Sequence, residues 1–413
     1  MTVEITPRVV FIGASGEMCR IAVKGLAKAL PKINITLADI RPEIIAEFAA
    51  SLGERVTVLK LDLFDAPALA NVVRGASLVI LGAGPYMRTS GPVVEACLEA
   101  KVPYLDFDDD VESTEHALSL DAKAKAAGIP VFIGCGASPG ITNVMTVDAA
   151  NDLDEVHRID VTWLVGHEKS VGKAVLEHLL HIAAGDCVTW EGGRRVTHDS
   201  MVATDYFPIL PNTPDMLLYE TAHPEPVTLP RKYPNADRIR CYGGLDPMCQ
   251  CGLARGIGLA VKAGTLTQKE AVQWVFDVAN GNSIGSWAGW KAAFSGMLAQ
   301  INRGESTYGE MIKYLVYSTF RKHLPYRGGL LAQVYGTKNG KPAVSARRCT
   351  MTPPNFGDMG GVTGLGCAAF AILALESGHK FAGTFAPEDW AEPARLYDAL
   401  TRVGVKAGIV EAL

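Results

Sequence analysis

Short apolar runs alternate with amphipathic stretches through the first third of the chain. This alternation is typical of βαβ units, in which a buried strand is followed by a helix that returns to the same sheet. Each run ends in a small or acidic residue, and the runs predict strands at residues 8–12, 33–38, 56–61, 78–81, 102–105 and 130–133. We therefore expect an α/β domain over residues 1–143, with a doubly wound parallel sheet that binds ligands beyond the carboxyl ends of its strands.

The pattern changes beyond residue 150, where polar and apolar residues alternate within runs that are separated by turn dipeptides. Asn339-Gly340 is one such turn, and it predicts a hairpin in a mainly antiparallel sheet. Residues 208–234 are rich in proline and are expected to be irregular, whereas residues 267–322 have a helical pattern. A second α+β domain is therefore expected over residues 144–355, followed by C-terminal helices over residues 356–413.

The composition narrows the class of protein. The chain has 413 residues, of which 48% are hydrophobic, so it can bury sizeable cores and is not a disordered protein. Its formal net charge is −5, from 39 Lys and Arg against 44 Asp and Glu. No run of Lys and Arg exceeds three residues, so the sequence lacks the electrostatic footprint of a protein that binds nucleic acid or an anionic membrane.

The cysteines and the apolar segments bear on localisation. The nine cysteines, an odd number, lie mostly within apolar runs, which indicates reduced, buried thiols. The first residues lack the basic and apolar regions of a signal peptide. The longest apolar stretch, residues 360–375, is expected to be too short to span a bilayer. We therefore expect a cytoplasmic protein, and the Trp- and Tyr-rich helices of residues 267–322 predict a homodimer.

The first predicted strand is followed by the turn Gly13-Ala14-Ser15-Gly16-Glu17-Met18, which opens a helix. A dinucleotide pyrophosphate binds backbone N–H groups at a helix N-terminus and needs small residues around it. Two glycines are present, but Ser15 and Met18 occupy the second and third glycine positions of the G-x-G-x-x-G fingerprint. The predicted strand before the turn and the predicted helix after it support binding of a nucleotide. We therefore assign the whole turn to cofactor binding.

Asp39 ends the second strand, 23 residues after Gly16, near the spacing of a carboxylate that binds the adenosine ribose. Such a carboxylate repels the 2′-phosphate of NADP and favours NAD, while Arg41 leaves room for NADP. The further candidates for cofactor contact are Ile40, Asp62 and Leu63. A solvated loop aspartate explains Asp62 equally well.

The next two strands also end in residues that can face a ligand. Gly82-Ala83-Gly84-Pro85 is expected to pass under the nicotinamide, and the Tyr86 hydroxyl is a candidate for orienting a substrate. Asp106 immediately follows the fifth strand and is a candidate base or ammonium ligand. Asp109 and Asp110 are expected to form a solvated helix start.

A glycine-rich loop follows the sixth strand and contains Cys135. A thiolate nucleophile needs a basic neighbour, and none is visible locally, so Cys135 is assigned to the lining of the pocket. Pro139 and Gly140, from the same loop, are candidates for substrate contact. In the second domain, His178 is a candidate for proton handling.

No metal site is predicted. His178 and His181 are three residues apart on one helix face, but no third ligand is evident, so structural histidines are favoured. His167 and Glu168 follow a predicted strand. A set of three cysteines has the spacing C-x7-C-x-C without a second pair, which disfavours zinc; its members are Cys241, Cys249 and Cys251.

Several segments together resemble the saccharopine dehydrogenase-like oxidoreductases. The strongest is GCGASPGITN (134–143), which is similar to the family's glycine-rich loop, and PVVEACLEAKVPYLDFD (92–108) is similar to its helix and Tyr-x-Asp strand. Three further segments resemble the family's second-domain and C-terminal signatures: HPEPVTLPR (223–231), YGTKNGKPA (335–343) and APEDW (386–390).

The resemblance implies a Rossmann domain, a second domain for substrate binding and dimerisation, and C-terminal helices that pack back on the first domain. It implies that Gly13, Ser15, Gly16 and Asp39 bind the cofactor, with NAD expected and NADP possible. It places Gly84 and Pro85 near the nicotinamide, with Tyr86, Asp106 and Cys135 lining the pocket. Met18, in place of the third glycine, implies a looser pyrophosphate turn.

The expected activity is NAD(P)-dependent hydride transfer to or from the C–N bond of a small amino-acid-related substrate. An arginine is expected to bind the substrate carboxylate, and Arg231 is the first candidate. One alternative keeps the cofactor but acts on a carbonyl, enoyl or lipid-like substrate. Another is a non-catalytic NAD(P)-binding sensor.

Overall fold

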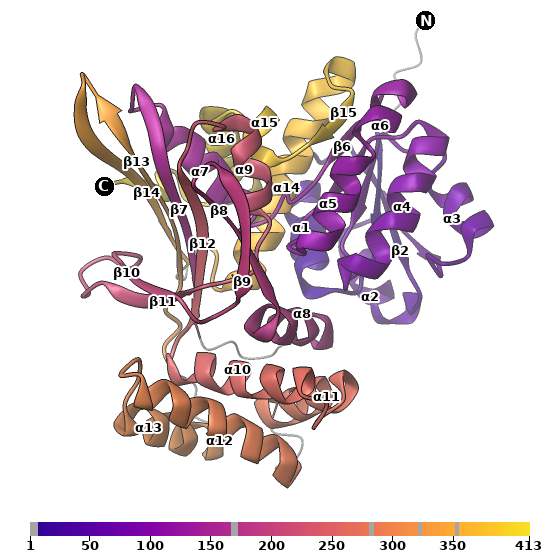
Figure 1. Cartoon of the computed structure of the whole chain (residues 1–413). Coiled ribbons are helices and arrows are strands. Elements are labelled where there is room, and N and C mark those ends of the chain that lie inside the picture. Colours follow the sequence, from indigo (N-terminus) through magenta and orange to yellow (C-terminus); the bar gives the residue numbers. More distant parts are fainter. Residues whose placement is uncertain (1–6, 167–171, 281–284, 321–323, 352–354) are drawn as a thin grey trace, which may run out of the picture. The chain divides into compact units, whose positions relative to one another are not determined.

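The computed structural model describes residues 7–166, 172–280, 285–320, 324–351 and 355–413. The chain divides into two compact units (Figure 1). Unit 1 contains Met1–Asn151 and Gly360–Glu411, and unit 2 contains Asp152–Met359 and Ala412–Leu413. The chain therefore leaves unit 1 and returns to it for its last segment.

Within the described residues, unit 1 is built on a seven-stranded parallel sheet in the order β15-β6-β5-β4-β1-β2-β3. β1 lies between β2 and β4, so the direction of winding reverses at β1. This arrangement confirms the predicted doubly wound sheet. Its strands are β1 (Arg8–Ile12), β2 (Asn34–Asp39), β3 (Val56–Lys60), β4 (Leu78–Leu81), β5 (Tyr104–Asp106), β6 (Pro130–Phe132) and β15 (Gly383–Phe385).

The helices of unit 1 pack one apolar face on this sheet or on each other. In α1 (Glu17–Ala29) the buried residues include Cys19, Ala22, Val23 and Leu26, which fall on one face of a helix. The other helices are α2 (Ala46–Ser51), α3 (Ala66–Val73), α4 (Tyr86–Ala100), α5 (Val111–Ser119), α6 (Asp121–Ala127), α7 (Ile141–Ala150), α14 (Met359–Ser377), α15 (Pro387–Trp390) and α16 (Pro393–Val403).

The C-terminal segment adds a strand that the sequence pattern does not predict. β15 pairs with β6 in parallel, with Thr384 opposite Val131. Three residues are too few to show a period-2 pattern, so only the flanking helices are visible in the sequence. Trp390 of α15 stacks on Phe132 of β6, with ring centroids 4.0 Å apart, and fixes this segment to the sheet.

The apolar helix α14 is longer than the sequence analysis expected. At 19 residues, with a mean hydropathy of 1.6 in its most apolar window, it is long and apolar enough to cross a membrane, so the prediction that it is too short was wrong. However, 72% of that window is buried in the structure, and Phe370 and Ile372 are fully buried. Burial in a protein core therefore explains its composition.

Unit 2 contains a mixed, mostly antiparallel sheet whose main path runs β10-β11-β12-β7-β13-β14-β16, with β8 and β9 beside β12. β7 and β12 pair in parallel, whereas the pairs β10–β11, β11–β12, β12–β8, β13–β14, β13–β7 and β8–β9 are antiparallel. This confirms the predicted α+β class. The strands are β7 (Glu155–Val165), β8 (Asp186–Glu191), β9 (Arg194–Asp199), β10 (Thr204–Phe207), β11 (Met216–Glu220), β12 (Arg238–Leu245), β13 (Gly329–Lys338), β14 (Lys341–Thr350) and β16 (Val410–Ala412).

The proline content predicted that residues 208–234 are irregular, and this prediction was wrong. They contain β11 and the helix α9 (Glu225–Lys232). Pro224 lies at the N-cap of α9 and Pro226 in its first turn, where a proline loses no hydrogen bond because the first N–H groups of a helix have no partner within it. The prolines therefore mark a helix start here.

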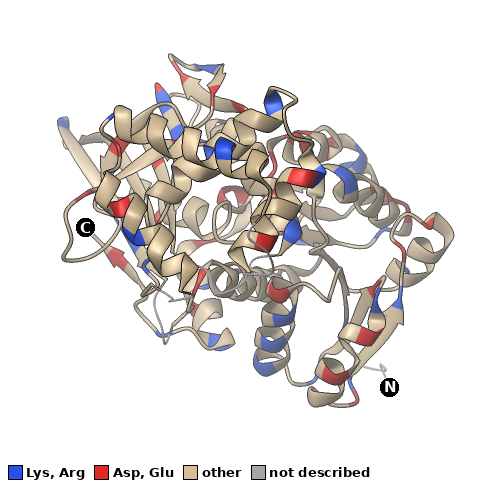
Figure 2. Cartoon of the chain, turned by 90° about the horizontal axis from the view of Figure 1, so that it is seen from below, with Lys and Arg blue, Asp and Glu red and all other residues tan. Residues whose placement is uncertain are grey.

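Four helices of unit 2, α10 (Cys249–Lys262), α11 (Gln268–Ala279), α12 (Trp287–Asn302) and α13 (Tyr308–Thr319), form a helical layer with its own core (Figure 1). Ile257, Trp274 and Met297 are among the buried residues of this core. This confirms the helical pattern predicted for residues 267–322 in the part of it that is described. The remaining helix of the unit is α8 (Lys173–Ala184). Acidic and basic residues occur together on the helices of the chain (Figure 2).

Candidate functional site

The turn between β1 and α1 has the backbone of an anion-binding site. Gly13 has a φ of 81°, and a Cβ added to it would lie 2.6 Å from Ala83, so only glycine fits. Gly16 is the N-cap of α1 and provides no side chain to accept a hydrogen bond from the first helical N–H groups. Those N–H groups and the positive end of the helix dipole are suited to a phosphate.

Asp39 joins this turn to the end of β2. One carboxylate oxygen accepts a hydrogen bond from the backbone N–H of Ser15 at 2.8 Å, and the other accepts from the N–H of Arg41 at 3.0 Å. Asp39 is therefore placed beside the phosphate-binding turn, where a ribose carboxylate is expected.

The expected loosening of the turn at Met18 is not seen. The N–H of Gly16 donates to the carbonyl of Gly13 at 3.1 Å and closes the turn. The close approach that a third glycine would permit is provided elsewhere, because a Cβ on Gly82 would lie 2.1 Å from the Cys19 Sγ. The small residue needed for tight packing is thus Gly82, after β4, and not a glycine in α1.

The other predicted cofactor residues lie at the same edge of the sheet. Ile40 is 57% exposed and Arg41 is exposed, directly after Asp39. Asp62 is exposed and its carboxylate accepts from the N–H of Phe64 at 3.0 Å, while Leu63 is half-buried. Asp62 thus stabilises its own loop.

Tyr86, at the start of α4, is buried and faces the protein interior. Its hydroxyl donates to the carbonyl of Leu81 at 3.5 Å, and its ring meets that of Phe107 edge-on at 5.9 Å. Burial, and then the nearby Asp106 carboxylate, raise the pKa of Tyr86 well above its usual range. The hydroxyl therefore stays protonated and can act only as a hydrogen-bond donor or as a packing group.

Asp106 is fully buried and holds three segments together. One carboxylate oxygen accepts from the N–H of Gly134 at 2.8 Å and from that of Asp108 at 3.2 Å. The other accepts from the Tyr104 hydroxyl at 2.8 Å. These contacts give Asp106 a positioning role at the end of β5, while its predicted role as a base stays a prediction.

The acidic run after β5 is not a solvated helix start. Asp108 is 1% exposed and Asp110 5% exposed, so the expectation for Asp110 was wrong. Burial raises the pKa of Asp106 to about 6, against the opposing hydrogen bond from Gly134. Burial and the adjacent Asp106 raise the pKa of Asp108 well above its usual range. Buried carboxylates side by side repel each other, so ionisation of one of them opposes ionisation of the other.

The glycine-rich loop after β6 is closed on itself and is held by the C-terminal segment. The N–H of Gly136 donates to the carbonyl of Pro139 at 3.1 Å, and that of Gly140 to the Asn143 side chain at 2.8 Å. The Asn143 amide donates in turn to Glu388 at 2.8 Å. Pro139 and Gly140 are thereby buried within unit 1.

Cys135 in this loop is also fully buried, with its thiol directed to the carbonyl of Ile133 at 3.7 Å. Burial, and then the Asp106 carboxylate, raise the pKa of Cys135 well above its usual range. The thiol is therefore protonated and cannot serve as a nucleophile. Its predicted place in the lining of the pocket stays a prediction.

In unit 2, His178 of α8 lies beside a buried pair that the sequence analysis did not assign. Its ring meets that of His223 edge-on at 6.0 Å, and Nδ1 of His223 is 3.2 Å from the Glu225 carboxylate. His223 and Glu225 belong to the segment HPEPVTLPR, whose H-x-E spacing was the available signal. Arg231 is exposed in the last turn of α9, and His167 and Glu168 lie outside the described residues.

Cys241 completes a group with His223 and Glu225 whose polar atoms lie within 4.8 Å of one another. Burial, and then the Glu225 carboxylate, raise the pKa of Cys241 well above its usual range, so the thiol is protonated. A second such group contains Cys187, His198 and Glu220, and there Arg240 lies 3.4 Å from the Glu220 carboxylate. We interpret the first group as a hydrogen-bonded network and the second as an ion-pair network.

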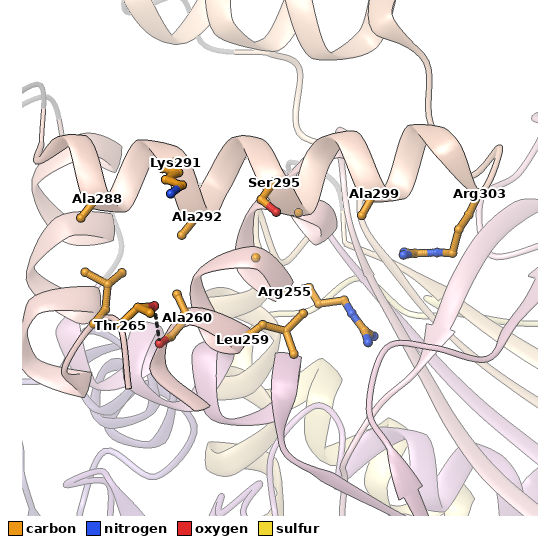
Figure 3. A pocket seen from close by; sticks show the side chains of 13 residues that line it. Arg255, Leu259, Ala260, Thr265, Ala288, Lys291, Ala292, Ser295, Ala299 and Arg303 are labelled. Atoms are coloured by element: carbon orange, nitrogen blue, oxygen red, sulfur yellow. Dashed lines mark hydrogen bonds between the residues drawn. The ribbon is translucent and has the colours of Figure 1, made fainter. Parts of the chain in front are cut away.

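A cavity of about 540 Å³ lies between α10 and α12 in unit 2 (Figure 3). Its walls are mostly small or apolar side chains, and Arg255, Lys291 and Arg303 bring positive charge to it. Arg255 donates to the carbonyls of Ser200 and Met201, and Arg303 pairs with Glu305 at 2.6 Å. The predicted site residues are not among those that line this cavity.

The uncapped helix start, the Asp39 bridge and the glycine turn after β4 define a dinucleotide-binding domain of the Rossmann class. Residues 9–132 match the family described as the saccharopine dehydrogenase NADP binding domain. This part of the chain is therefore similar to an NAD(P)-binding domain of that family, in agreement with the resemblance that the sequence motifs indicated.

Three curated relatives are similar over part of their length. A carboxyaminopropylagmatine dehydrogenase of Synechocystis sp. is 32% identical over 37% of this chain and 40% of its own. A carboxynorspermidine synthase of Vibrio cholerae is 29% identical over 48% of this chain and 50% of its own. A trans-acting enoyl reductase of Mycobacterium leprae is 28% identical over 31% of this chain and 32% of its own. The matched regions thus span half or less of these relatives.

The fold is shared over a greater length. The structure of saccharopine dehydrogenase (L-Glu forming) from Saccharomyces cerevisiae matches with a TM-score of 0.63, covering 98% of this chain and 100% of that one. The identity is 15%, so this likeness concerns the fold alone. The matched region includes both units of the chain.

We predict that Asp106→Asn weakens the pH dependence of stability. The folded pKa of about 6 exceeds the ordinary 3.8, so the folded protein binds more protons than the unfolded chain between these values. The free energy of unfolding therefore falls as the pH rises through about 4 to 6, by roughly 3 kcal/mol for this group. Asn keeps the N–H contacts and has no charge, so urea titrations from about pH 4 to about pH 6, the range between the two pKa values, should show a smaller fall than in the wild type.

The matched control is Asp62→Asn, which removes an exposed carboxylate that follows β3, at the far edge of the same sheet. Its stability curve should run parallel to that of the wild type. A parallel curve for Asp106→Asn as well would show that Asp106 does not titrate in the folded protein as described.

Proposed function

We propose that the chain is an NAD(P)-dependent oxidoreductase that acts on the C–N bond of a small, amino-acid-related amine or imine. The observation that carries the proposal is the carboxyl edge of the unit 1 sheet, where the α1 N-terminus, Asp39 and the turn at Gly82 come together in a domain of the matched family. Two of the relatives are named for carboxylated polyamine derivatives. These names support an amine substrate.

The residues present fit a dinucleotide. The space above Gly13 that a Cβ would fill is taken by Ala83, so the backbone turn stays narrow, and the first N–H groups of α1 have no side-chain cap. These N–H groups would bind the pyrophosphate, and Asp39 would bind the ribose hydroxyls. When bound, the nicotinamide supplies the hydride chemistry.

Asp39 supports a preference for NAD. Its carboxylate is fixed in direction by the N–H groups of Ser15 and Arg41, so it cannot turn away from a 2′-phosphate. A like charge held there disfavours NADP, whereas Arg41 is the one nearby side chain in the described loop that could compensate. The description of the family refers to NADP, and a measurement on this chain is therefore needed.

For proton handling we propose His178, with the buried pair His223 and Glu225 as its support. Glu225 faces Nδ1 of His223 at 3.2 Å and can hold the proton on that nitrogen, which fixes the tautomer of the ring that meets His178. His178 is half-buried, so it is the member of this group that a substrate can reach. Arg231 stays the candidate for binding a substrate carboxylate.

A second candidate function is reduction of an enoyl group. The observation that favours it is the similarity to a trans-acting enoyl reductase. Both functions use the same cofactor site, and they differ in the substrate.

The proposal is tested by a screen of cofactor turnover at alkaline pH. NAD and NADP are each paired with amino acids and with carboxylated polyamines, and NADH and NADPH with enoyl thioesters. Reduction of NAD by an amine is the expected result. Oxidation of NADH by an enoyl thioester, without amine turnover, would replace it with the second function. Binding of the cofactor with no turnover in either arm would contradict both.

Replacing Asp39 with Asn should lower the preference for NAD over NADP about tenfold or more, which corresponds to about 1.4 kcal/mol. Asn keeps one of the two acceptor oxygens, so the change removes the charge together with one of the hydrogen bonds from the N–H groups of Ser15 and Arg41. The measurement is the ratio of dissociation constants for the two cofactors. Glu54→Gln, which removes an exposed carboxylate of unit 1 outside the predicted cofactor residues, serves as the control and should leave this ratio unchanged. The same ratio in both variants would remove Asp39 from cofactor selection.

His178→Gln should reduce kcat by about two orders of magnitude, the usual contribution of one general acid or base, and should remove one limb of the pH profile. His198→Gln is the matched control, because His198 also lies beside a buried glutamate, at 3.2 Å from Glu220. Its profile should resemble the wild type. A full profile with both limbs in His178→Gln would exclude His178 from proton transfer.

A further inference from the structure

The floor of the cavity between α10 and α12 is formed by backbone. A Cβ on Gly256 would strike the carbonyl oxygen of Ala292, and a Cβ on Gly296 would strike that of Gly252. The two helices are therefore in direct contact at these glycines, and no larger residue fits at the contact. Gly256 and Gly296 both line the cavity, so its floor carries no side chains at these positions.

The walls above this floor are mostly short and aliphatic. They include Ala260, Ala292 and Ala299, which each end in a methyl group, together with Leu259. The described residues that line the cavity include no aromatic ring on which a planar ligand could stack. A volume of about 540 Å³ with mostly apolar walls lies within the range of small-molecule sites, and here it suits an aliphatic ligand.

Arg255 and Arg303 lie at one end of this cavity (Figure 3). Arg303 is paired with Glu305, since its Nε and Nη2 donate to the two carboxylate oxygens at 2.6 and 2.8 Å. Arg255 instead donates to two backbone carbonyls, those of Ser200 and Met201. Among the described residues no carboxylate forms an ion pair with Arg255, so its charge is the one at this end that a ligand could balance.

The remaining donors of Arg255 suit a carboxylate. All three nitrogens of a guanidinium carry N–H donors, and both described hydrogen bonds of Arg255 come from Nη1. Nε and Nη2 lie side by side on the planar group and can donate to the two oxygens of one carboxylate. Burial, and then the neighbouring Arg303, lower the pKa of Arg255, so an anion bound here would offset an unfavourable charge.

We propose that this cavity binds a small, unbranched aliphatic carboxylate, whose charged group pairs with Arg255 and whose chain lies along the glycine floor toward Lys291. Charge complementarity identifies the acid, and the aliphatic walls identify the chain. From position 291 to position 303 the helix extends about 18 Å at about 1.5 Å per residue, so the chain has room. Lys291 is exposed, and its ammonium can stay in water while its methylene groups add to the wall.

This site goes beyond the proposed oxidoreductase activity. Its lining residues all lie between positions 255 and 303 in unit 2, and none of them is a predicted cofactor or substrate residue. A bound acid would contact α10 and α12 together, so it should stabilise the helical layer by binding to its folded form.

The first experiment titrates the full chain with octanoate, below the concentration at which it forms micelles, in an isothermal titration calorimeter. We expect one site with a dissociation constant of about 1 mM or tighter, which is ordinary for a ligand of this size. Octanol has the chain without the charge and acetate has the charge without the chain, so each should bind about tenfold more weakly. Hexanoate should bind about fivefold more weakly, because two methylene groups are lost from a partly exposed wall.

A pair of charge variants tests the end at which the acid binds. Arg255→Gln should weaken octanoate binding about tenfold or more, because the paired guanidinium is lost. Lys291→Gln is the matched control, since it removes the same charge from the same cavity but from an exposed ammonium. It should change the dissociation constant by about twofold or less.

A steric variant leaves Arg255 and its contacts with Ser200 and Met201 in place. Ala299 is exposed and lines the cavity, so Ala299→Leu should block the groove without disturbing the core, and octanoate binding should fall about tenfold or more. Ala263→Leu is the control, because Ala263 is exposed at the C-cap of α10 and does not line the cavity. Circular dichroism of each variant excludes unfolding as the cause.

The proposal is overturned if octanoate shows no saturable binding, which is the outcome expected if a protein surface covers the groove. It is also overturned if octanol binds as well as octanoate, or if Arg255→Gln binds octanoate no more weakly than Lys291→Gln. Unchanged binding in Ala299→Leu would place the ligand elsewhere. These experiments measure binding and need no turnover, so failure here leaves the proposed activity untouched.

Discussion

The buried carboxylate of Asp106 is the contact on which the ligand-facing edge of unit 1 depends. A carboxylate removed from water is costly unless its oxygens accept hydrogen bonds, and here they accept from Tyr104, Asp108 and Gly134. These donors belong to β5, to the acidic run after it and to the loop after β6. One side chain thereby fixes the distance between neighbouring strand ends, which is the distance a bound dinucleotide would have to match.

The same edge is held from the other end of the chain. Asn143 connects the glycine-rich loop to Glu388, and Phe132 stacks on Trp390. Both contacts join residues more than two hundred positions apart, so the site is complete only when the C-terminal segment is in place. Rigid support of this kind explains how irregular loops can keep a fixed geometry without disulfide bonds, since the described cysteines are all free.

Sequence reasoning succeeded where a pattern is local and strong. The strands of unit 1, the glycine turn at Gly13 and the acid at Asp39 are each visible within a few residues. It failed where tertiary contacts decide. The burial of Asp110, the pairing of β15 and the position of His223 beside His178 depend on segments distant in sequence, and no local periodicity reports them. The length of the helix α14 was underestimated, because the apolar stretch seen in the sequence covers residues 360–375 whereas the helix runs from Met359 to Ser377.

The interruption of unit 1 by unit 2 has a consequence for biosynthesis. A ribosome releases Met1–Asn151 long before Gly360–Glu411 exists, so β6 is at first the outer strand of the sheet, with the edge that later pairs with β15 unpaired. Exposed strand edges recruit other chains, and the nascent protein must pass through this state while the whole intervening unit is translated. Translation speed and chaperone supply are therefore expected to govern the yield of soluble protein more strongly than they would for a domain with a continuous sequence.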